Sequence, residues 1–470
     1  DRTESAIKAN GFRMPRTKLV INLSPAELKK TDAAFDLHIA IGILAASEQI
    51  SPIHLIDKYI MMGELGLDGK LYPIKGVLAM AMQAKADGFL GILLPYENAA
   101  EAALVDDMNI YCFEHLTEVV DFIAQPDTKS PIKRTRLVMD HETISVTDFS
   151  DVKGQENVKR ALEIASAGSH NIIMIGPPGA GKTMLAKSIV SILPPLNQME
   201  ALETSKIYSI TGKLDAVNKL LRSRPFRHPH HSLSAIALIG GGSHPQPGEI
   251  SLAHNGVLFL DELPEFNRSV IEVLRQPMEE GVVCIARAKM SVTFPARFML
   301  MAAMNPCPCG YYNHPKKECH CSPALIQKYM HKISGPLLDR IDMHIEVIPI
   351  LYNELRASKQ EESSATIATR VKNAREIQSH RFKNEAGTYT NAQMNSGQLK
   401  KYCTITPEGE AILKMAMEKF QLSARAFDRI IKVSRSIADL DNSNAIQLNH
   451  ISEALQFRSL DKSSWGQYKN

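Results

Sequence analysis

The sequence GPPGAGKT, residues 176–183, follows a run of apolar residues and precedes a helix-forming stretch. A G-x-x-x-x-G-K-T pattern between a strand and a helix is typical of a loop that turns its backbone N–H groups toward phosphates. In such a loop Lys182 reaches the β and γ phosphates of ATP, and the Thr183 hydroxyl ligates Mg²⁺. The residues that we expect around the phosphates are Gly176, Pro177, Pro178, Gly179, Ala180, Gly181, Lys182 and Thr183.

A second apolar run, in GVLFLDELPEF, ends in the paired carboxylates Asp261 and Glu262. Nucleotide hydrolysis needs one acid on the cation and another that polarises the attacking water. We assign the first task to Asp261 and the second to Glu262. Acidic strand ends are common, but one that accompanies a phosphate loop indicates an ATPase.

Two further polar residues follow apolar segments. Asn305 follows the apolar run of RFMLMAAMNP, and an amide at that place can hold the nucleophilic water. Arg340, in GPLLDRIDMHIEV, can stabilise transition-state charge on the γ-phosphate of a neighbouring subunit. The alternatives are a plain polar strand end for Asn305 and, for Arg340, an ion pair with Asp339 or Asp342.

Four of the seven cysteines lie in one segment, CPCGYYNHPKKECHC. Four thiolates close a tetrahedral zinc site and can fold a loop that is too small for a core of its own. The C-x-C spacing is tighter than usual for zinc, and a disulfide is the less expected alternative in a cytosolic protein. We predict a structural Zn²⁺ site, with no open position for catalysis, at Cys307, Cys309, Cys319 and Cys321.

The elements that must position these residues divide the chain of 470 residues into three domains. Residues 1–124 alternate strands and helices, with strands expected at 18–25 and 91–95, helices at 35–47 and 77–88, and a hairpin at 63–76. Residues 125–147 are an expected linker, because Pro, Ser and Lys replace the apolar periodicity. Residues 148–350 form an α/β ATPase core with a parallel sheet, and residues 351–470 a helical region.

Composition excludes several classes of protein. A net charge of +3 does not by itself imply nucleic-acid binding, so any such surface is local. No apolar run reaches the length of a membrane helix and no signal peptide is visible, so we expect a cytoplasmic protein without a membrane partner. The chain opens on DRTESAIKANGF without methionine, and we expect its N-terminal domain to be truncated at the start.

The motifs GPPGAGKT, LFLDE, AAMNP, LLDRID and LSARAFDRIIKVSRSIADL, in this order, resemble the AAA+ ATPases. More narrowly, the whole chain resembles the magnesium-chelatase-like YifB/ComM family of competence and branch-migration proteins. The resemblance implies a homo-oligomeric, hexameric ring with ATP/ADP and Mg²⁺ as cofactors and a helical C-terminal lid. It also implies that Arg425 is the second sensor of the nucleotide, where the alternative is an ordinary helix charge.

Residues 19–124 resemble the Lon-protease-type domain of this family. Serine-lysine proteolysis needs a hydroxyl beside a buried lysine. The segment FDLHIAIG offers no serine at Leu37 or His38, and Lys75 lies at an offset from the expected lysine. We therefore expect a protease-like fold without proteolytic chemistry, used for assembly or partner binding.

Two insertions bear on the substrate. The segment RSRPFRHPHHSLSAIALIGGG resembles the helix-2 insert of the family, and the spacing of its histidines, His228, His230 and His231, is poor for one metal ion. The segment VVCIARAKMSVTFPARF reads as a hairpin with Arg287 and Lys289 near its tip. In related hexameric motors such hairpins contact DNA phosphates inside the ring, whereas the alternative is a solvated turn.

Three functions remain open. The first is a ring-shaped ATP-driven DNA motor, such as a helicase or branch-migration enzyme in transformation or recombination. The second is the ATPase subunit of a metal-inserting chelatase. The third is an ATPase that remodels a protein partner. The N-terminal domain and the cysteine cluster favour the first function over the second.

Overall fold

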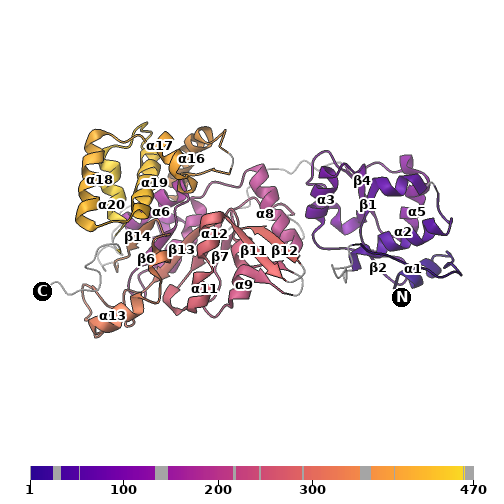
Figure 1. Ribbon diagram of the computed structural model, residues 1–470, viewed down its shortest axis with the longest axis horizontal. Coiled ribbons are helices and arrows are strands. Elements are labelled where there is room, and N and C mark those ends of the chain that lie inside the picture. Colours follow the sequence, from indigo (N-terminus) through magenta and orange to yellow (C-terminus); the bar gives the residue numbers. More distant parts are fainter. Residues whose placement is uncertain are drawn as a thin grey trace. The chain divides into compact units, whose positions relative to one another are not determined.

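The computed structural model describes residues 2–24, 33–51, 53–132, 147–214, 219–242, 245–287, 290–349, 361–385, 387–458 and 460 (Figure 1). They belong to two compact units. The first unit consists of Asp1–His141, Asn197–Arg222 and Ala286–Ser291, and the second of Glu142–Leu196, Ser223–Ile285 and Val292–Asn470. The range 148–350 therefore supplies two segments to the first unit.

The first unit is built on a parallel three-stranded sheet with the order β1-β4-β5. Its strands are β1 Tyr59–Met61, β4 Gly91–Pro95 and β5 Asn109–Phe113, with an antiparallel hairpin of β2 Glu64–Leu65 and β3 Leu71–Tyr72. Its helices are α1 Arg2–Ala9, η1 Ala33–Phe35, α2 Asp36–Ala46, η2 Ile53–Lys58, α3 Val77–Ala86, η3 Tyr96–Asn98, α4 Ala99–Ala102, α5 Leu116–Ala124, η4 Pro126–Thr128 and α8 Gln198–Thr211. The helices expected at 35–47 and 77–88, the strand at 91–95 and the hairpin are confirmed.

The strand expected at 18–25 is wrong for the part of it that the structure describes. Residues 18–24 form no strand, and the side chains of Leu19, Val20 and Ile21 are exposed. Apolar and β-branched residues favour a strand only where a neighbouring backbone completes the hydrogen-bond ladder. No ladder to these residues occurs among the described strands.

Helix α8 packs against α3, although its sequence lies between the phosphate loop and Asp261. The buried Glu101 carboxylate joins the two helices, because it accepts hydrogen bonds from the Leu78 backbone at 2.9 Å and from the Ser209 hydroxyl. The side chain of Lys75 lies against the end of α8. A Cβ added to Gly212, the residue that follows α8, would be 2.8 Å from Cε of Lys75.

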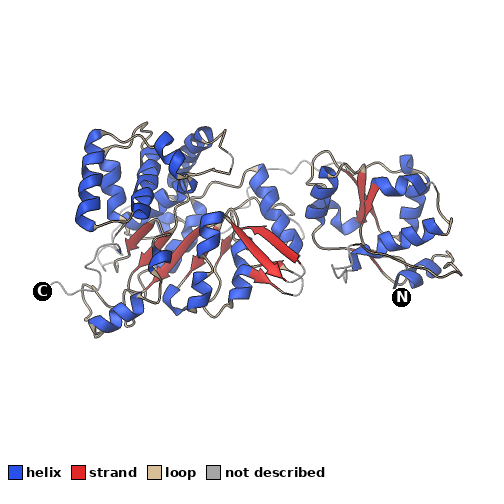
Figure 2. Cartoon of the chain, in the orientation of Figure 1, coloured by secondary structure: helices blue, strands red, loops and turns tan. Residues whose placement is uncertain are grey.

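The second unit contains a five-stranded sheet with the order β14-β6-β13-β10-β7, in which all neighbouring strands are parallel (Figure 2). Its strands are β6 Ile172–Ile175, β7 Phe226–Arg227, β10 Val257–Leu260, β13 Met299–Met304 and β14 Met343–Glu346. This arrangement confirms the expected α/β fold with a parallel P-loop sheet and a helical C-terminal part.

Both faces of this sheet are buried, because successive side chains of a strand point to opposite faces. Ile172 and Met174 of β6 belong to one apolar cluster, which also includes residues of the C-terminal helices. Ile173 and Ile175 belong to the other cluster, which covers the opposite face. Helices therefore lie on both sides of the strands (Figure 2).

The remaining elements surround the sheet. The helices of the second unit are η5 Phe149–Asp151, α6 Glu156–Gly168, α7 Lys182–Ser188, η6 Ile189–Ser191, α9 Ala235–Ile239, α10 Glu249–Leu252, η7 Leu263–Glu265, α11 Arg268–Glu272, α12 Arg275–Glu280, α13 Pro323–Met330, α14 Gly335–Leu338, α16 Ser364–Arg381, η8 Asn391–Gln393, α17 Ser396–Tyr402, α18 Pro407–Phe420, α19 Ala424–Leu440 and α20 Leu448–Gln456. Its short hairpin pairs β8 Gly240–Gly241 with β9 Gln246–Pro247. The expected hairpin before β13 pairs β11 Val282–Arg287 with β12 Met290–Pro295, and its residues Ala286–Ser291 belong to the first unit.

The C-terminal helices pack as a group, with α16 and α19 both contacting α6 (Figure 1). Hydroxyl groups cap three of these helices: Ser363 precedes α16, Thr406 precedes α18 and Ser423 precedes α19, and each side chain accepts a backbone hydrogen bond. Among the described residues, no helix has the length and apolar character needed to cross a membrane.

Candidate nucleotide site and cysteine cluster

The predicted ATPase residues follow three neighbouring strands. The phosphate loop follows β6, Asn305 follows β13, and Asp261 and Glu262 follow β10. Because the strands are parallel and adjacent, their carboxyl ends meet at one edge of the sheet, which is where open α/β sheets bind ligands. The structure thus brings these residues together.

Glycines give the phosphate loop its shape. Gly179 and Gly181 have φ angles of +78° and +84°, which disfavour any residue with a Cβ. Gly176 lies so close to the chain after β14 that a Cβ on it would be 2.3 Å from the Val347 carbonyl oxygen. Helix α7 begins directly after the loop, so its N-terminus faces the phosphate position.

Lys182 is held inside this loop, with 8% of its surface exposed. Its ammonium group donates to the carbonyls of Gly176 at 2.7 Å and Pro177 at 2.9 Å, and to Asn305 Oδ1 at 3.1 Å. Burial lowers the pKa of Lys182, while the charges of Asp261 and Glu262 act in the opposite direction. A nucleotide phosphate would replace these carbonyls as the partner of the ammonium.

The two expected Mg²⁺ ligands are in contact. The Thr183 hydroxyl donates to Asp261 Oδ2 at 2.6 Å, and Asp261 Oδ1 accepts the Glu262 backbone N–H at 2.9 Å. One hydroxyl and one carboxylate oxygen fit Mg²⁺, which takes few protein ligands and keeps waters and substrate phosphates. Glu262 has a φ of +52°, and its side chain is exposed where a water can approach it.

Two histidines of the insert lie beside the acidic pair, which sequence reasoning did not predict. His231 Nδ1 is 3.7 Å from Glu262 Oε2, and the His228 ring lies 4.8 Å from the ring of Phe259 on β10. Burial lowers the pKa of His228, against the charge of Asp261. The sequence signal that could have predicted this position is Phe226–Arg227, directly before HPHH. These two residues form β7, which pairs with β10.

Arg340 is 6% exposed, and its guanidinium contacts residues of the same chain. Nη1 donates to the Pro336 carbonyl at 2.6 Å, and Nη2 lies 2.6 Å from Glu279 Oε1. Glu279 is a partner that we did not predict. Action on a neighbouring subunit requires Arg340 to release Glu279, and that role stays a prediction.

The remaining predicted residues lie elsewhere. Arg425 is exposed in the first turn of α19, and Arg287 is exposed at the end of β11. Lys289 lies outside the described residues, as does most of the predicted linker, 133–146.

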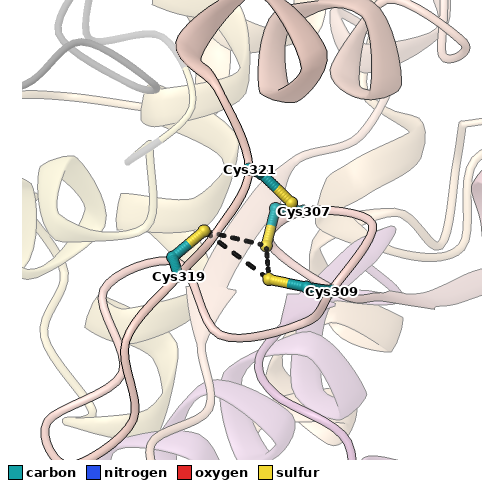
Figure 3. A group of neighbouring side chains, drawn as sticks. All are labelled: Cys307, Cys309, Cys319 and Cys321. Atoms are coloured by element: carbon teal, nitrogen blue, oxygen red, sulfur yellow. Dashed lines mark hydrogen bonds between the residues drawn. The ribbon is translucent and has the colours of Figure 1, made fainter.

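The four predicted cysteines converge (Figure 3). Their sulfur atoms all lie within 4.8 Å of one another, and Cys307 Sγ is 3.3 Å from Cys309 Sγ and 3.7 Å from Cys319 Sγ. Four sulfurs at about 2.3 Å from a tetrahedral ion are about 3.8 Å apart, so the cluster can hold a metal.

One thiol of the cluster favours its ionised form. Burial raises the pKa of Cys309, but hydrogen bonds from the Tyr311 backbone and from the neighbouring thiols outweigh it and lower this pKa to about 6. The thiolate is the form of cysteine that binds metal.

This fold and this site define a P-loop ATPase of the AAA+ class. Residues 148–355 match the family described as magnesium chelatase, subunit ChlI, and residues 361–458 match its C-terminal family. Residues 1–98 match the family described as subunit ChlI of Mg-chelatase.

Relatives that match nearly the whole chain narrow the family assignment. The chain is 42% identical to an uncharacterized protein YifB of Salmonella typhimurium and 42% identical to the competence protein ComM of Haemophilus influenzae, each over 98% of this chain and 89% of the relative. A magnesium-chelatase 67 kDa subunit of Heliobacterium mobile is 26% identical over 44% of this chain and 33% of its own length. The chain belongs to the magnesium-chelatase-like YifB/ComM family.

Proposed function

We propose that the protein is an ATP-driven motor that assembles into a hexameric ring and acts on DNA without reading its sequence. The observation that carries the hydrolytic half is the meeting of Lys182, Asp261 and Asn305 at one sheet edge, with Glu262 exposed beside them. The proposed action on DNA rests on the hairpin β11–β12 with its exposed Arg287, and on similarity to a relative named competence protein ComM.

The hydrolytic residues divide the work. Thr183 and Asp261 would hold Mg²⁺, which would neutralise negative charge that develops on the phosphates. Lys182 would exchange the loop carbonyls for phosphate oxygens, and Glu262 would accept a proton from the attacking water. Asn305 would orient that water, and its proposed role is supported by its amide oxygen, which lies 3.1 Å from the Lys182 ammonium.

We assign structural Zn²⁺ to the cysteine cluster. Its ligand set is four sulfurs, which favours Zn²⁺ over Mg²⁺ or Ca²⁺, and it leaves no position for substrate. The ion would hold the surface loop that follows Asn305.

A chelatase-type role is the second candidate, because all three matched families carry the chelatase description. The partial and lower identity to a chelatase subunit, beside 42% identity over nearly the whole chain to YifB and ComM, favours the motor.

The experiment that tests the motor is ATP turnover with and without forked or four-way DNA, together with strand displacement. We expect stimulation by DNA in the parent protein. The double variant Arg287→Ala, Lys289→Ala should keep its basal turnover and lose both the stimulation and strand displacement, because it lacks charges that track the phosphates.

A control variant, Lys414→Ala with Lys419→Ala, removes the same charge from exposed positions of α18 and should respond to DNA as the parent does. Each lost phosphate contact should flatten the slope of log affinity against log salt by about 0.7 to 0.9. Equal slopes in both variants would remove the hairpin from DNA binding. A parent protein that neither binds DNA nor responds to it would favour the chelatase role.

A further inference from the structure

The cysteine loop begins at the nucleotide site. Cys307 lies two residues after Asn305, and Cys321 is followed by Ser322, whose hydroxyl caps α13. The loop therefore starts at the end of a central strand and ends at a helix. A group that fixes the shape of this loop therefore also fixes the positions of the strand end and of the helix start.

Gly310, inside the loop, touches the phosphate loop. It is buried and has a φ of +83°, and a Cβ added to it would lie 2.6 Å from Cδ and 3.2 Å from Cγ of Pro178. The absence of a side chain thus lets the two loops meet. Pro178 belongs to the segment that surrounds the phosphates, so this contact supports the nucleotide-binding backbone from outside.

Tyr329 of α13 makes the second connection. Burial raises the pKa of its hydroxyl, and the nearby Asn305 backbone acts in the opposite direction. Tyr329 is 7% exposed and belongs to the same apolar cluster as Met304, which precedes Asn305, and Leu263, which follows the acidic pair. Helix α13 thereby holds the strand end that presents the Asn305 amide.

The interior of the cysteine loop consists largely of its own ligands. Cys307 and Cys321 are buried with Ile326, and Met330 contacts this small cluster and also the large cluster that contains Tyr329. A loop with so small an apolar core depends on its metal for a fixed shape, because metal binding and folding are coupled. Loss of the metal should therefore change the positions of Gly310 and Tyr329.

We propose that the metal-thiolate cluster is a brace of the ATPase site, with Gly310 positioning Pro178 for nucleotide binding and Tyr329 positioning Asn305 for hydrolysis. The inference rests on the proposed metal site. It predicts that loss of the metal weakens nucleotide binding and slows turnover, although no cysteine touches the nucleotide.

The two positioning residues separate the two effects. Tyr329→Phe keeps the ring and removes the hydroxyl, so kcat should fall about tenfold or more while the Kd of a fluorescent ATP analogue stays within about twofold. Gly310→Ala should raise that Kd about tenfold, because the loop must move away from Pro178. The matched control is Gly88→Ala, since Gly88 has a φ of +80° and nothing within 4 Å of an added Cβ.

Metal removal completes the test. The purified full-length protein is treated with a zinc-selective chelator in the presence of Mg²⁺, and metal content, Kd of the fluorescent analogue and melting temperature are measured before and after zinc is restored. We expect a higher Kd and a lower kcat without zinc, both reversed by zinc.

The outcomes distinguish the inference from the metal site itself. If the protein contains no metal as purified and takes up none, both the metal site and its proposed support of the ATPase site are wrong. Protein that contains zinc, but keeps its Kd and kcat after the zinc is removed, would overturn the brace and leave the metal site standing. Equal Kd in Gly310→Ala and Gly88→Ala would remove Gly310 from the proposal, and an unchanged kcat in Tyr329→Phe would remove Tyr329.

Discussion

Arg429 of α19 donates a hydrogen bond at 2.7 Å to the carboxylate of Asp342, which is completely buried at the start of β14. The same carboxylate accepts the Asn171 backbone N–H at 2.8 Å. Burial opposes ionisation of Asp342, but the charge of Arg429 and the neighbouring His170 ring, whose Nδ1 lies 3.7 Å from the carboxylate, outweigh it and keep the pKa low. The C-terminal helices are thus joined to the ATPase sheet by a buried ion pair.

Removal of Arg429 should destabilise the protein strongly. Arg429→Met leaves the Asp342 charge buried without its cation, which costs about 3–5 kcal/mol in comparable pairs. Urea denaturation and the melting temperature measure the loss. Arg425→Met is the matched control, because Arg425 is exposed one turn earlier on the same helix, and it should leave the free energy of unfolding nearly unchanged.

The Arg425→Met variant, which should leave stability nearly unchanged, should instead affect catalysis. If Arg425 is the second sensor, Arg425→Met should weaken the coupling of nucleotide binding to turnover in a stably folded protein. A stable Arg425→Met protein with the turnover of the parent would contradict the sensor assignment. An Arg429→Met protein as stable as the parent would show that Asp342 has another compensating partner.

Sequence reasoning succeeded where a local pattern sets the structure. The apolar runs at β6, β10 and β13, which precede the phosphate loop, the acidic pair and Asn305, predicted three strands and the residues at their ends. Parallel pairing then places those ends at one edge. The cysteines were predicted for a similar reason, since their close spacing in one loop leaves few arrangements.

Long-range pairings could not be predicted in the same way. Asp342 appeared as a candidate partner of Arg340, yet it pairs with Arg429, which is 87 residues away in sequence. Arg340 pairs with Glu279. The predicted strand at 18–25 failed in its described part because residue preference carries no information about a pairing partner. Helix α8 reads as part of the ATPase core, but its packing surface lies on α3.

The protein should lose stability in mild acid because of two buried histidines. Burial lowers the pKa of His170 and holds the pKa of His344 well below its ordinary value. Below a pH of about 6.5 the unfolded chain therefore binds protons that the folded chain does not, and the free energy of unfolding falls as pH falls. Each histidine contributes up to about 1.4 kcal/mol per pH unit between its unfolded-state and folded-state pKa values.

Urea denaturation between pH 8 and pH 5 measures this dependence. Stability should be nearly constant above pH 7 and decline below it, and His344→Leu should decline less steeply than the parent. Asp342 adds its own loss only below about pH 4, where the unfolded carboxylate begins to take up protons. Constant stability from pH 7 to pH 5 would show that neither histidine remains neutral in the folded protein.

The cysteine cluster should contain one zinc ion per chain. Cys309→Ser should lower the zinc content and the melting temperature together, because ligand loss releases both the ion and the loop that it folds. Cys284→Ser is the matched control, since Cys284 is exposed on β11 outside the cluster, and should retain its zinc. Elemental analysis of protein purified without chelators provides the measurement, and equal zinc in the two variants would rule out Cys309 as a ligand.

Arg340 should act on the ATP of a neighbouring subunit, so two inactive variants should restore each other. Glu262→Gln binds nucleotide but cannot activate the water, and Arg340→Ala lacks the charge that stabilises the transition state. In a mixed ring some interfaces combine an intact Glu262 with an intact Arg340, and ATP turnover should reappear there. Native mass measurement confirms that mixed rings form. Mixed rings without any turnover would mean that Arg340 acts only within its own chain, where its ion pair with Glu279 already holds it.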